Sequence, residues 1–212
     1  MLGCFDPIVR LHQRGFVPRG VLDVGAHDGV FAGRLRMIWP GARMLLLEAN
    51  PALEPKLAAT GLPYRICLLV ATGGEADFYV DRANGESTGN SMFLERSHHF
   101  MDPVVRRLPM RRLDDVVDDP AAYDFMKLDV QGAELDVLAG APRTLGAVRC
   151  LFVEVSLHEC NRGAPLFFDV HARLHGLGFR MVDAGELVVV GSRMLQMNAL
   201  FERGPWEDGS LF

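Results

Sequence analysis

Apolar residues gather in short runs along this chain, and the runs alternate with stretches that repeat at helical spacing. The runs predicted as strands are 21–24, 44–48, 64–71, 76–80, 104–110, 123–130, 150–155, 179–182, 187–190 and 195–201. The stretches predicted as helices are 6–16, 30–39, 52–60, 134–141 and 166–177, with a helical turn within 111–117. Continuous apolar runs are typical of parallel strands that are covered on both faces. The alternation therefore predicts an α/β fold, with a mostly parallel sheet and helices on both of its faces.

Two segments interrupt this alternation. Gly73 and Gly74 follow the run at 64–71, and they predict a tight turn into an antiparallel hairpin with 76–80. Residues 81–103 are polar and rich in glycine, and a long loop inside a compact domain usually carries function. We interpret it as a lid or substrate loop, in which the His98–His99 pair could contact a substrate or only face solvent.

Length and composition narrow the class of protein. The chain has 212 residues, which favours one domain over 1–212 with an N-terminal helix inside 1–18. A net charge of -5 argues against a nucleic-acid binder. No apolar run is long enough to span a bilayer, and the N-terminus lacks the features of a signal peptide. The four cysteines form no CxxC pair, so we expect free thiols in a cytoplasmic protein.

The run Val21–Val24 leads directly into a turn that carries Gly25 and Gly29, and a helical stretch follows. This order is typical of a nucleotide-binding α/β unit. Glycine at these positions permits either a positive φ or the close approach of a ligand. Asp23 stands near the end of the strand, where it would repel a pyrophosphate and attract an amine and a sulfonium. The motif therefore favours S-adenosylmethionine over NAD.

Acids also stand at or near the ends of three further predicted strands. Glu48 lies 19 residues beyond Gly29, a separation typical of an acid that binds ribose hydroxyls, although NAD enzymes share this feature. Asp129 could orient a ligand or take a proton from a hydroxyl. Glu154 lies in the following strand. Ligands bind at the carboxyl ends of parallel strands, so we expect these acids to surround one site.

Several of these residues admit a second interpretation. Glu134 could contact a substrate, or it could be an acid that the helix dipole favours. Lys127 shares a face of its strand with Asp129, so the two could form a structural or a catalytic pair. His158 could be a general base or a loop residue. No spacing among Asp129, Glu154 and His158 specifies a metal, and we predict none.

Beyond these patterns, several segments resemble the FkbM-type methyltransferases, which depend on S-adenosylmethionine. The segments are 21–29, 47–51, 89–91, 112–115, 196–201 and, above all, 126–141 with its Lys-x-Asp-x-Gln-Gly-x-Glu block. The resemblance covers about 19–203 and implies a Rossmann-like class I fold, with seven strands and an antiparallel last strand. It also implies methyl transfer to a hydroxyl of a sugar or natural product. Gln131 stands where the family often has Glu.

The resemblance and the strand-end acids together define an expected site. We expect the cofactor to contact Asp23, Gly25, His27, Asp28, Gly29, Glu48, Ala49, Asn50 and Asp129. We expect catalysis by Asp129 and His158, and acceptor binding by Asn90, Ser91, Gln131, Glu134 and Glu154. Class I methyltransferases often have an acid after the third strand. The apolar segment 67–70 lacks this acid, so adenine would be held by packing and backbone contacts.

The expected products are S-adenosylhomocysteine and a methylated small molecule or carbohydrate. An NAD(P)-dependent oxidoreductase and a non-catalytic Rossmann-like binding module stay open as alternatives. A homodimer is one option for the oligomeric state, which the sequence does not decide.

Overall fold

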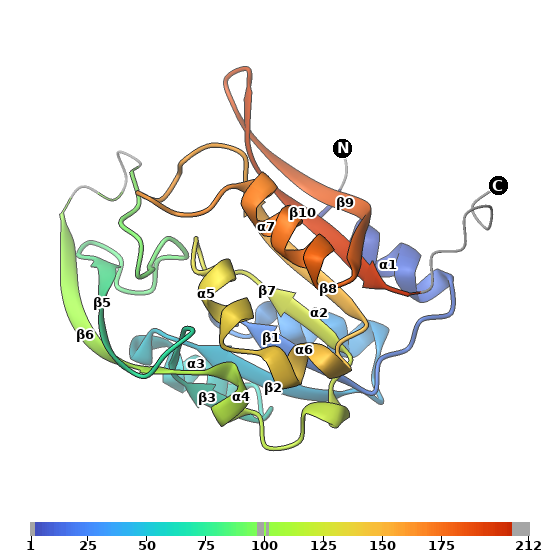
Figure 1. The fold of residues 1–212 in the computed structure, drawn as a ribbon. Helices are drawn as coiled ribbons and strands as arrows, with labels where there is room; N and C mark the ends of the chain where they lie inside the picture. The colour runs from blue at the N-terminus through green and yellow to red at the C-terminus, as the bar shows by residue number, and fades with distance from the viewer. Residues whose placement is uncertain (1–2, 97–99, 101, 205–212) are drawn as a thin grey trace.

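The computed structural model of the chain describes residues 3–96, 100 and 102–204. Ten strands form two sheets within these residues (Figure 1). The main sheet has the order β3-β2-β1-β7-β8-β10-β9, with bounds β1 Gly20–Val24, β2 Arg43–Glu48, β3 Tyr64–Ile66, β7 Phe125–Leu128, β8 Cys150–Ser156, β9 Phe179–Val190 and β10 Arg193–Arg203. The second sheet has the order β4-β6-β5, with bounds β4 Leu68–Leu69, β5 Gly74–Asp81 and β6 Pro103–Arg111.

The main sheet is parallel except at one strand. β1, β2, β3 and β7 run parallel to their neighbours, and β8 runs parallel to β7. β10 pairs antiparallel with both β8 and β9. The predicted sheet of seven mostly parallel strands with an antiparallel last strand is confirmed. Because the parallel strands point the same way, the residues that follow them gather at one edge of the sheet.

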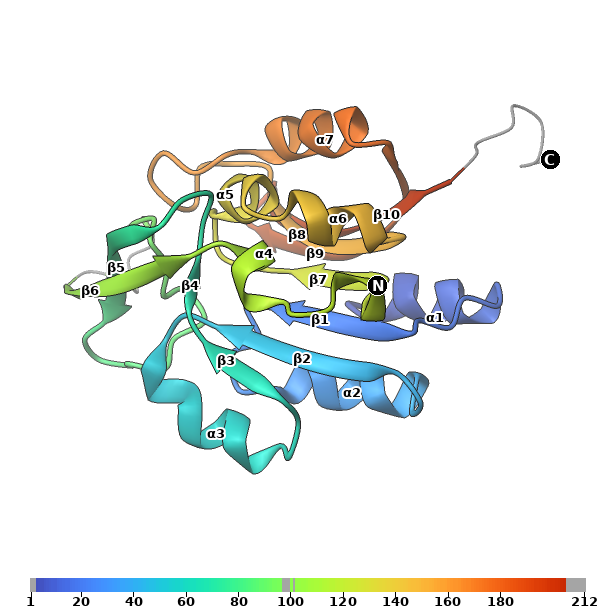
Figure 2. The same cartoon turned by 60° about the horizontal axis from the view of Figure 1, so that its bottom comes forward.

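Helices cover both faces of the main sheet, which leaves its central strands without access to solvent. Their bounds are α1 Asp6–Gln13, α2 Val30–Ile38, α3 Glu54–Ala59, α4 Leu113–Val116, α5 Glu134–Ala139, α6 Pro142–Ala147 and α7 Phe167–Gly176. Two short 3-10 turns occupy Pro51–Leu53 and Pro120–Ala122. α1, α2 and α3 pack on one face, and α4 to α7 pack on the other (Figure 2). Alternate residues of each strand enter the two cores, as Val21 and Leu22 do on β1.

The predicted hairpin between 64–71 and 76–80 is wrong. The first of these runs divides at Cys67 into β3, which belongs to the main sheet, and β4, which belongs to the second. β6 lies between β4 and β5, and it pairs with β5 over eight residue pairs, from Gly74↔Met110 to Asp81↔Pro103. It pairs with β4 over only two. The long strand β6, distant in sequence, therefore takes the place that a local hairpin would have filled.

Two further elements differ from the prediction. A second helix, α6, begins at Pro142 directly after the predicted helix 134–141, because proline is well suited to the first turn of a helix. The runs 179–182 and 187–190 join into the single strand β9. Gly185 interrupts the apolar pattern because the strand passes close to α1 there, and a Cβ would lie 2.9 Å from Pro7. None of the described helices is long and apolar enough to cross a membrane.

Candidate functional site

A cavity lies at the carboxyl ends of β1, β2 and β7, where the second sheet meets the main sheet. Figures 1 and 2 both place β5 and β6 at this end of the molecule, away from the C-terminus. The polar part of the cavity is lined by Gly25, His27, Glu48, Asn50, Asp129 and Gln131. The apolar part is lined by Leu53, Leu68, Leu69, Phe78 and Met92. Residues from strands β1, β2, β4 and β5 and from the loops between the elements thus line one cavity that has both polar and apolar walls.

Glu48 stands at the end of β2 with its carboxylate fixed in the cavity wall. One carboxylate oxygen accepts a hydrogen bond from the backbone N–H of His27 and the other from that of Asn50, each at 2.8 Å. His27 has a φ of 50°, a rare value for a residue with a side chain. Only 9% of Glu48 is exposed. The carboxylate is held in one orientation and keeps lone pairs for hydroxyl groups in the cavity.

The glycines of the first turn are required by neighbouring protein atoms. Gly25 has a φ of 77°, and a Cβ there would lie 1.7 Å from the carbonyl oxygen of Asp129. Gly29 has a φ of 78°, and a Cβ would lie 2.7 Å from the methyl group of Thr60. The sequence offers two explanations for these glycines, a positive φ or the close approach of a ligand. The structure supports the positive φ, together with close packing of the chain against itself.

Asp23 does not line the cavity; it is completely buried. Lys127 Nζ lies 3.5 Å from Asp23 and 3.2 Å from Asp129, and it donates a 2.6 Å hydrogen bond to the carbonyl of Gly25. Burial raises the pKa of Asp23 to about 6, against the opposing effect of Lys127. The sequence predicts that Asp23 faces a cation of the ligand, whereas the structure places a cation of the protein, Lys127, beside it. Asp23 therefore connects to the cavity only through Lys127, which also holds the carbonyl of Gly25.

Asp129, Gln131 and Glu154 form a hydrogen-bonded network beside the cavity. The amide nitrogen of Gln131 donates to Asp129 at 2.9 Å and to Glu154 at 2.6 Å. Gln196 of β10 donates to the same oxygen of Glu154 at 3.2 Å. Burial, followed by the Asp129 carboxylate, raises the pKa of Glu154 well above its ordinary value. Gln131 has a φ of 52°, so the backbone holds its side chain between the two acids at the cost of a rare conformation.

Three of the expected acceptor residues form hydrogen bonds with the backbone of the protein's own loops, and their contact with an acceptor stays a prediction. Asn90 lines the cavity, but its side chain accepts from Asp81 N at 2.9 Å and donates to Gly85 O at 3.0 Å. Ser91 is buried and donates to the carbonyl of Gln131 at 2.8 Å. Glu134 is buried and accepts the backbone N–H groups of the turn at residues 130 and 132, at 3.3 and 3.1 Å. This supports the early-helix interpretation of Glu134.

Of three further expected residues, Ala49 lines the cavity, and His158 and Asp28 do not. His158 is exposed after β8 and lines neither this cavity nor the hollow described below, so the structure does not bring it to Asp129. Asp28 accepts the backbone N–H of Val30 at 3.1 Å, outside the cavity lining. Ala49 packs beside the apolar cluster of the second sheet and lines the cavity as expected.

The loop after β5 closes over the cavity. The carbonyl of Gly85 accepts a 2.7 Å hydrogen bond from Asn50, and the carbonyl of Glu86 accepts one of 2.7 Å from His27 Nε2. Lys56 of α3 pairs with Glu86 at 2.6 Å. The predicted lid therefore lies against the cavity wall, held by these contacts. Its opening stays a prediction. His98 and His99 lie outside the described residues.

A second hollow adjoins the cavity. Ser87, Thr88 and Gln131 line both spaces. The remaining wall of the hollow is formed by Asp81, Gly89, Glu95, Phe100, Cys160 and Asn161. Asp81, Gly89, Glu95 and Phe100 belong to the segment 81–103, which the sequence predicts as a lid or substrate loop without naming these residues. Cys160 and Asn161 lie outside that segment, and no pattern in the sequence marks them as site residues. In the part of the chain that the structure describes, no group of His, Cys, Asp and Glu side chains is arranged to hold a metal.

Comparisons with known proteins identify the family of the chain. The model of the methyltransferase FkbM domain matches residues 23–181. The 2-O-methyltransferase NoeI of Sinorhizobium fredii is 27% identical over 161 residues, which are 68% of this chain and 65% of NoeI. The antimetabolite synthetase AmbE of Pseudomonas aeruginosa is 28% identical over 183 residues, 68% of this chain but 8% of AmbE. The chain therefore matches only part of the length of each relative.

Solved structures show the same fold. A methyltransferase FkbM from Methylobacillus flagellatus superposes with a TM-score of 0.55 at 16% identity, over 86% of this chain and 43% of that one. The magnesium protoporphyrin IX methyltransferase ChlM of Synechocystis, solved with bound SAM, has a TM-score of 0.54 at 12% identity, over 95% and 78% of the two chains. The fold is that of the class I methyltransferases. Since the FkbM model covers most of its length, the chain belongs to the FkbM-type methyltransferase family.

Proposed function

We propose that the chain binds S-adenosylmethionine in the cavity and transfers its methyl group to a hydroxyl of a sugar or similar small natural product. Family membership and the partial match to NoeI, named as a 2-O-methyltransferase, support this activity. They also favour it over the NAD(P)-dependent oxidoreductase that the sequence left open. The observation that carries the proposal is the Glu48 carboxylate, which is fixed by two backbone N–H groups beside an apolar wall.

The lining of the cavity fits an adenosyl group. Glu48 would accept hydrogen bonds from the ribose hydroxyls, as acids at this position of a Rossmann-like fold do. The apolar wall, which includes Leu68, Leu69 and Phe78, would hold the adenine by packing. Asp129 would stand beside the methionine part of the cofactor, next to Gln131, which lines both the cavity and the second hollow. When bound, S-adenosylmethionine supplies a methyl group on a positively charged sulfur.

The residues of the chain would act mainly by positioning. Holding two reactants in line can contribute about 7–11 kcal/mol to catalysis. Asp129, with 30% of its side chain exposed, would accept the proton of the acceptor hydroxyl, while Lys127 and Gln131 fix its two oxygens. The lid contacts of His27 and Asn50 would exclude water. This assigns the proton transfer to the Asp129 network and leaves His158 outside it.

The test is a pair of measurements on the same preparation. Calorimetry should show that S-adenosylhomocysteine binds and that NAD and NADP do not. Transfer of a radioactive methyl group from S-adenosylmethionine to a panel of glycosides and hydroxylated natural products should then identify an acceptor. Binding without transfer to any member would favour the non-catalytic module, and tighter binding of NAD would favour the oxidoreductase.

The cytoplasmic location and the organisation as one domain stay predictions.

A further inference from the structure

We propose that the chain forms a two-fold symmetric dimer through residues 187–194, the arm at the turn end of the β9–β10 hairpin, where β9 of one copy adds to β9 of the other. The inference concerns an interaction surface and does not depend on the proposed reaction. It specifies where two copies meet and in which register, and so goes beyond the homodimer that the sequence left open.

The arm extends past the strands beside it. β8 pairs with β10 only as far as Ser156↔Gln196, so the hairpin continues beyond the end of its neighbour. Figure 1 shows this hairpin projecting from the rest of the molecule. Within the described residues, β9 is the last strand of the main sheet, and no strand pairs with its outer edge. The N–H and C=O groups of that edge are therefore available to another chain.

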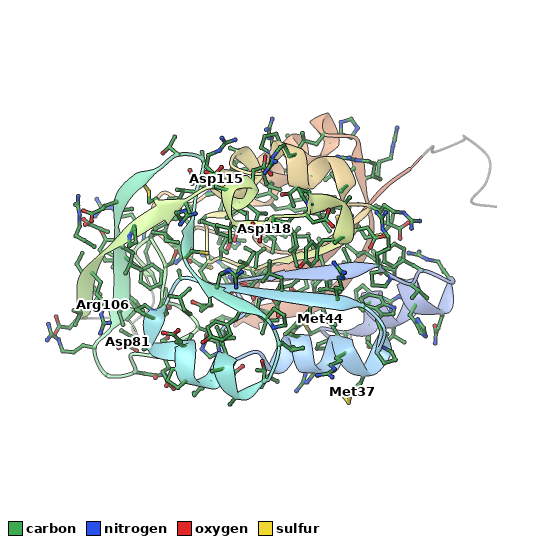
Figure 3. All side chains as sticks on the ribbon, turned by 90° about the horizontal axis from the view of Figure 1, so that it is seen from below. Met37, Met44, Asp81, Arg106, Asp115 and Asp118 are labelled. Carbon is green, nitrogen blue, oxygen red and sulfur yellow. The ribbon has the colours of Figure 1, made fainter. Side chains whose placement is uncertain are left out.

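The arm is apolar where a solvated edge strand is normally charged. Five of its side chains are 37–62% exposed, namely Leu187, Val188, Val189, Val190 and Met194. Residues 187–190 include no charged residue and no proline, which natural edge strands use against association. Elsewhere, exposed apolar side chains are scattered, such as Met37, which projects from α2 (Figure 3). The contiguous apolar edge of the arm fits another strand better than it fits water.

An irregularity in β9 sets the length of the interface. The register with β10 shifts between Ala184 and Leu187, which leaves Gly185 and Glu186 as a bulge. Bulges bend an edge strand and interrupt its pairing. The regular stretch that a second copy can extend is therefore 187–190.

This stretch complements itself about a two-fold axis at Val188. The two-residue turn after Val190 makes that residue part of the hydrogen-bonded closing pair of the hairpin. The alternation of an antiparallel ladder then turns the N–H and C=O groups of Val189 and Leu187 to the free edge. Pairing Leu187 of each copy with Val189 of the other satisfies these groups in both directions. The same register brings the two Val188 side chains together at the axis.

Charge complementarity supports this register. Glu186 contacts the Cys4 thiol on the α1 side of the sheet, and Arg193 pairs with Val190, which shares that side. Neither Glu186 nor Arg193 forms an ion pair within the described residues. In the dimer, Glu186 stands opposite Val190 of the other copy and two strand spacings, roughly 10 Å, from Arg193 of that copy. The two long side chains span this gap, and the symmetry forms the pair twice.

Sedimentation equilibrium on the full chain tests the association. We expect a monomer–dimer equilibrium with a dissociation constant between about 1 and 100 µM, because the edge is small for an interface. Val188→Lys should raise this constant by about tenfold or more, since like charges then meet at the axis. Val17→Lys, the same change at a 61% exposed site before β1, should leave it unchanged.

Val188→Cys tests the register. The introduced thiols would face each other in a non-hydrogen-bonded pair with Cα atoms about 4.5 Å apart, which permits a disulfide. Val190→Cys lies on the same face, but its two copies would be roughly 14 Å apart. Oxygen with a copper catalyst, followed by non-reducing electrophoresis, should give a covalent dimer for Val188→Cys. Val190→Cys should give no more than the wild type with its four cysteines.

A charge exchange tests the ion pair. Glu186→Arg and Arg193→Glu should each weaken the dimer by about threefold or more, and the double variant should recover, because the pair then forms with reversed charges. A double variant no tighter than either single one would overturn the register.

Three further results would overturn the proposal. They are a chain that is monomeric at about 100 µM, a dimer that Val188→Lys does not weaken, and a covalent dimer from Val190→Cys rather than from Val188→Cys. A monomer that binds vesicles of anionic lipid through the arm would likewise overturn it and would assign the arm to a membrane surface.

Discussion

Lys127 of β7 lies directly opposite Asp23 of β1 in the register of the parallel strands, and its ammonium group contacts Asp129 as well. Burial by itself would lower the pKa of Lys127, but the carboxylates of Asp129 and Asp23 raise it above the ordinary lysine value. One buried cation thus links the strand that precedes the glycine turn to Asp129 in the wall of the cavity. The stability of the fold and the geometry of the site depend on the same side chain.

Replacing Lys127 with methionine should strongly destabilise the protein. The change leaves Asp23 buried without a counter-charge, and the loss of one partner of a buried pair costs roughly 3–5 kcal/mol. Urea unfolding followed by circular dichroism measures this loss. The double variant Asp23→Asn/Lys127→Met should recover part of it, because the unpaired carboxylate is then removed. If the double variant is as unstable as the single one, the ion pair is not the cause.

Stability should fall as the pH rises from about 4.5 to 7.5. Burial raises the pKa of Glu134 to about 7 and that of Asp23 to about 6. A carboxyl group with a raised folded pKa stabilises the fold below its unfolded pKa, and this contribution is lost as the pH rises through the folded value. Glu134→Gln keeps the accepting oxygen and should remove roughly 1–3 kcal/mol of the pH dependence. Urea unfolding at several pH values tests this, and parallel curves for variant and wild type would contradict it.

Glu48→Gln should weaken the binding of S-adenosylhomocysteine by about 10- to 100-fold. The amide group turns one donor toward the backbone N–H of either His27 or Asn50, and the charged acceptor for the ribose is lost, an effect worth roughly 1.5–3 kcal/mol. Calorimetry on the folded variant measures the affinity. Glu54→Gln, an exposed change on α3, serves as the matched control. Equal affinities for wild type and Glu48→Gln would exclude Glu48 from the cofactor site.

Gln131→Met should separate catalysis from cofactor binding. The methionine keeps the volume but cannot donate to Asp129 and Glu154, so the two acids lose their common partner. We expect the rate constant for methyl transfer to fall about 10- to 100-fold, by analogy with the loss of one positioned proton-transfer group, while the affinity for S-adenosylhomocysteine changes by less than about threefold. Gln196→Met, which removes only the second donor to Glu154, should have a smaller effect. An equal loss of affinity and rate would indicate a cofactor role instead.

His158→Ala should leave the rate of methyl transfer within about twofold of the wild type. A surface substitution of this kind rarely changes the stability of the fold, so the rate should change only if the side chain acts in the reaction. The side chain is exposed, and it lines neither the cavity nor the hollow. Initial rates with the acceptor identified in the transfer assay test this. A loss of tenfold or more would restore His158 as the general base and would require the loop after β8 to move during the reaction.

Much of the fold could be predicted from the sequence because the signals are local. Apolar runs identify the strands of the main sheet, and the glycine turn after Val24 marks the start of the cavity. The position of Glu48 at the end of β2 follows from the same pattern, and the structure places it in the cavity wall. These features depend on residues that are near one another in the chain, so their spacing is sufficient to predict them.

The tertiary structure decided what depends on distant residues. The insertion of β6 between β4 and β5 follows from pairing across more than twenty intervening residues, which no local turn signal contains. The sequence predicts that Asp23 faces a ligand cation, but the register of β1 and β7 places Lys127 there. The acids of the hollow, Asp81 and Glu95, come together only when the loop after β5 folds against residues 160–162. The sequence alone therefore determined which strands carry the site, and the packing of the loops determined which side chains face it.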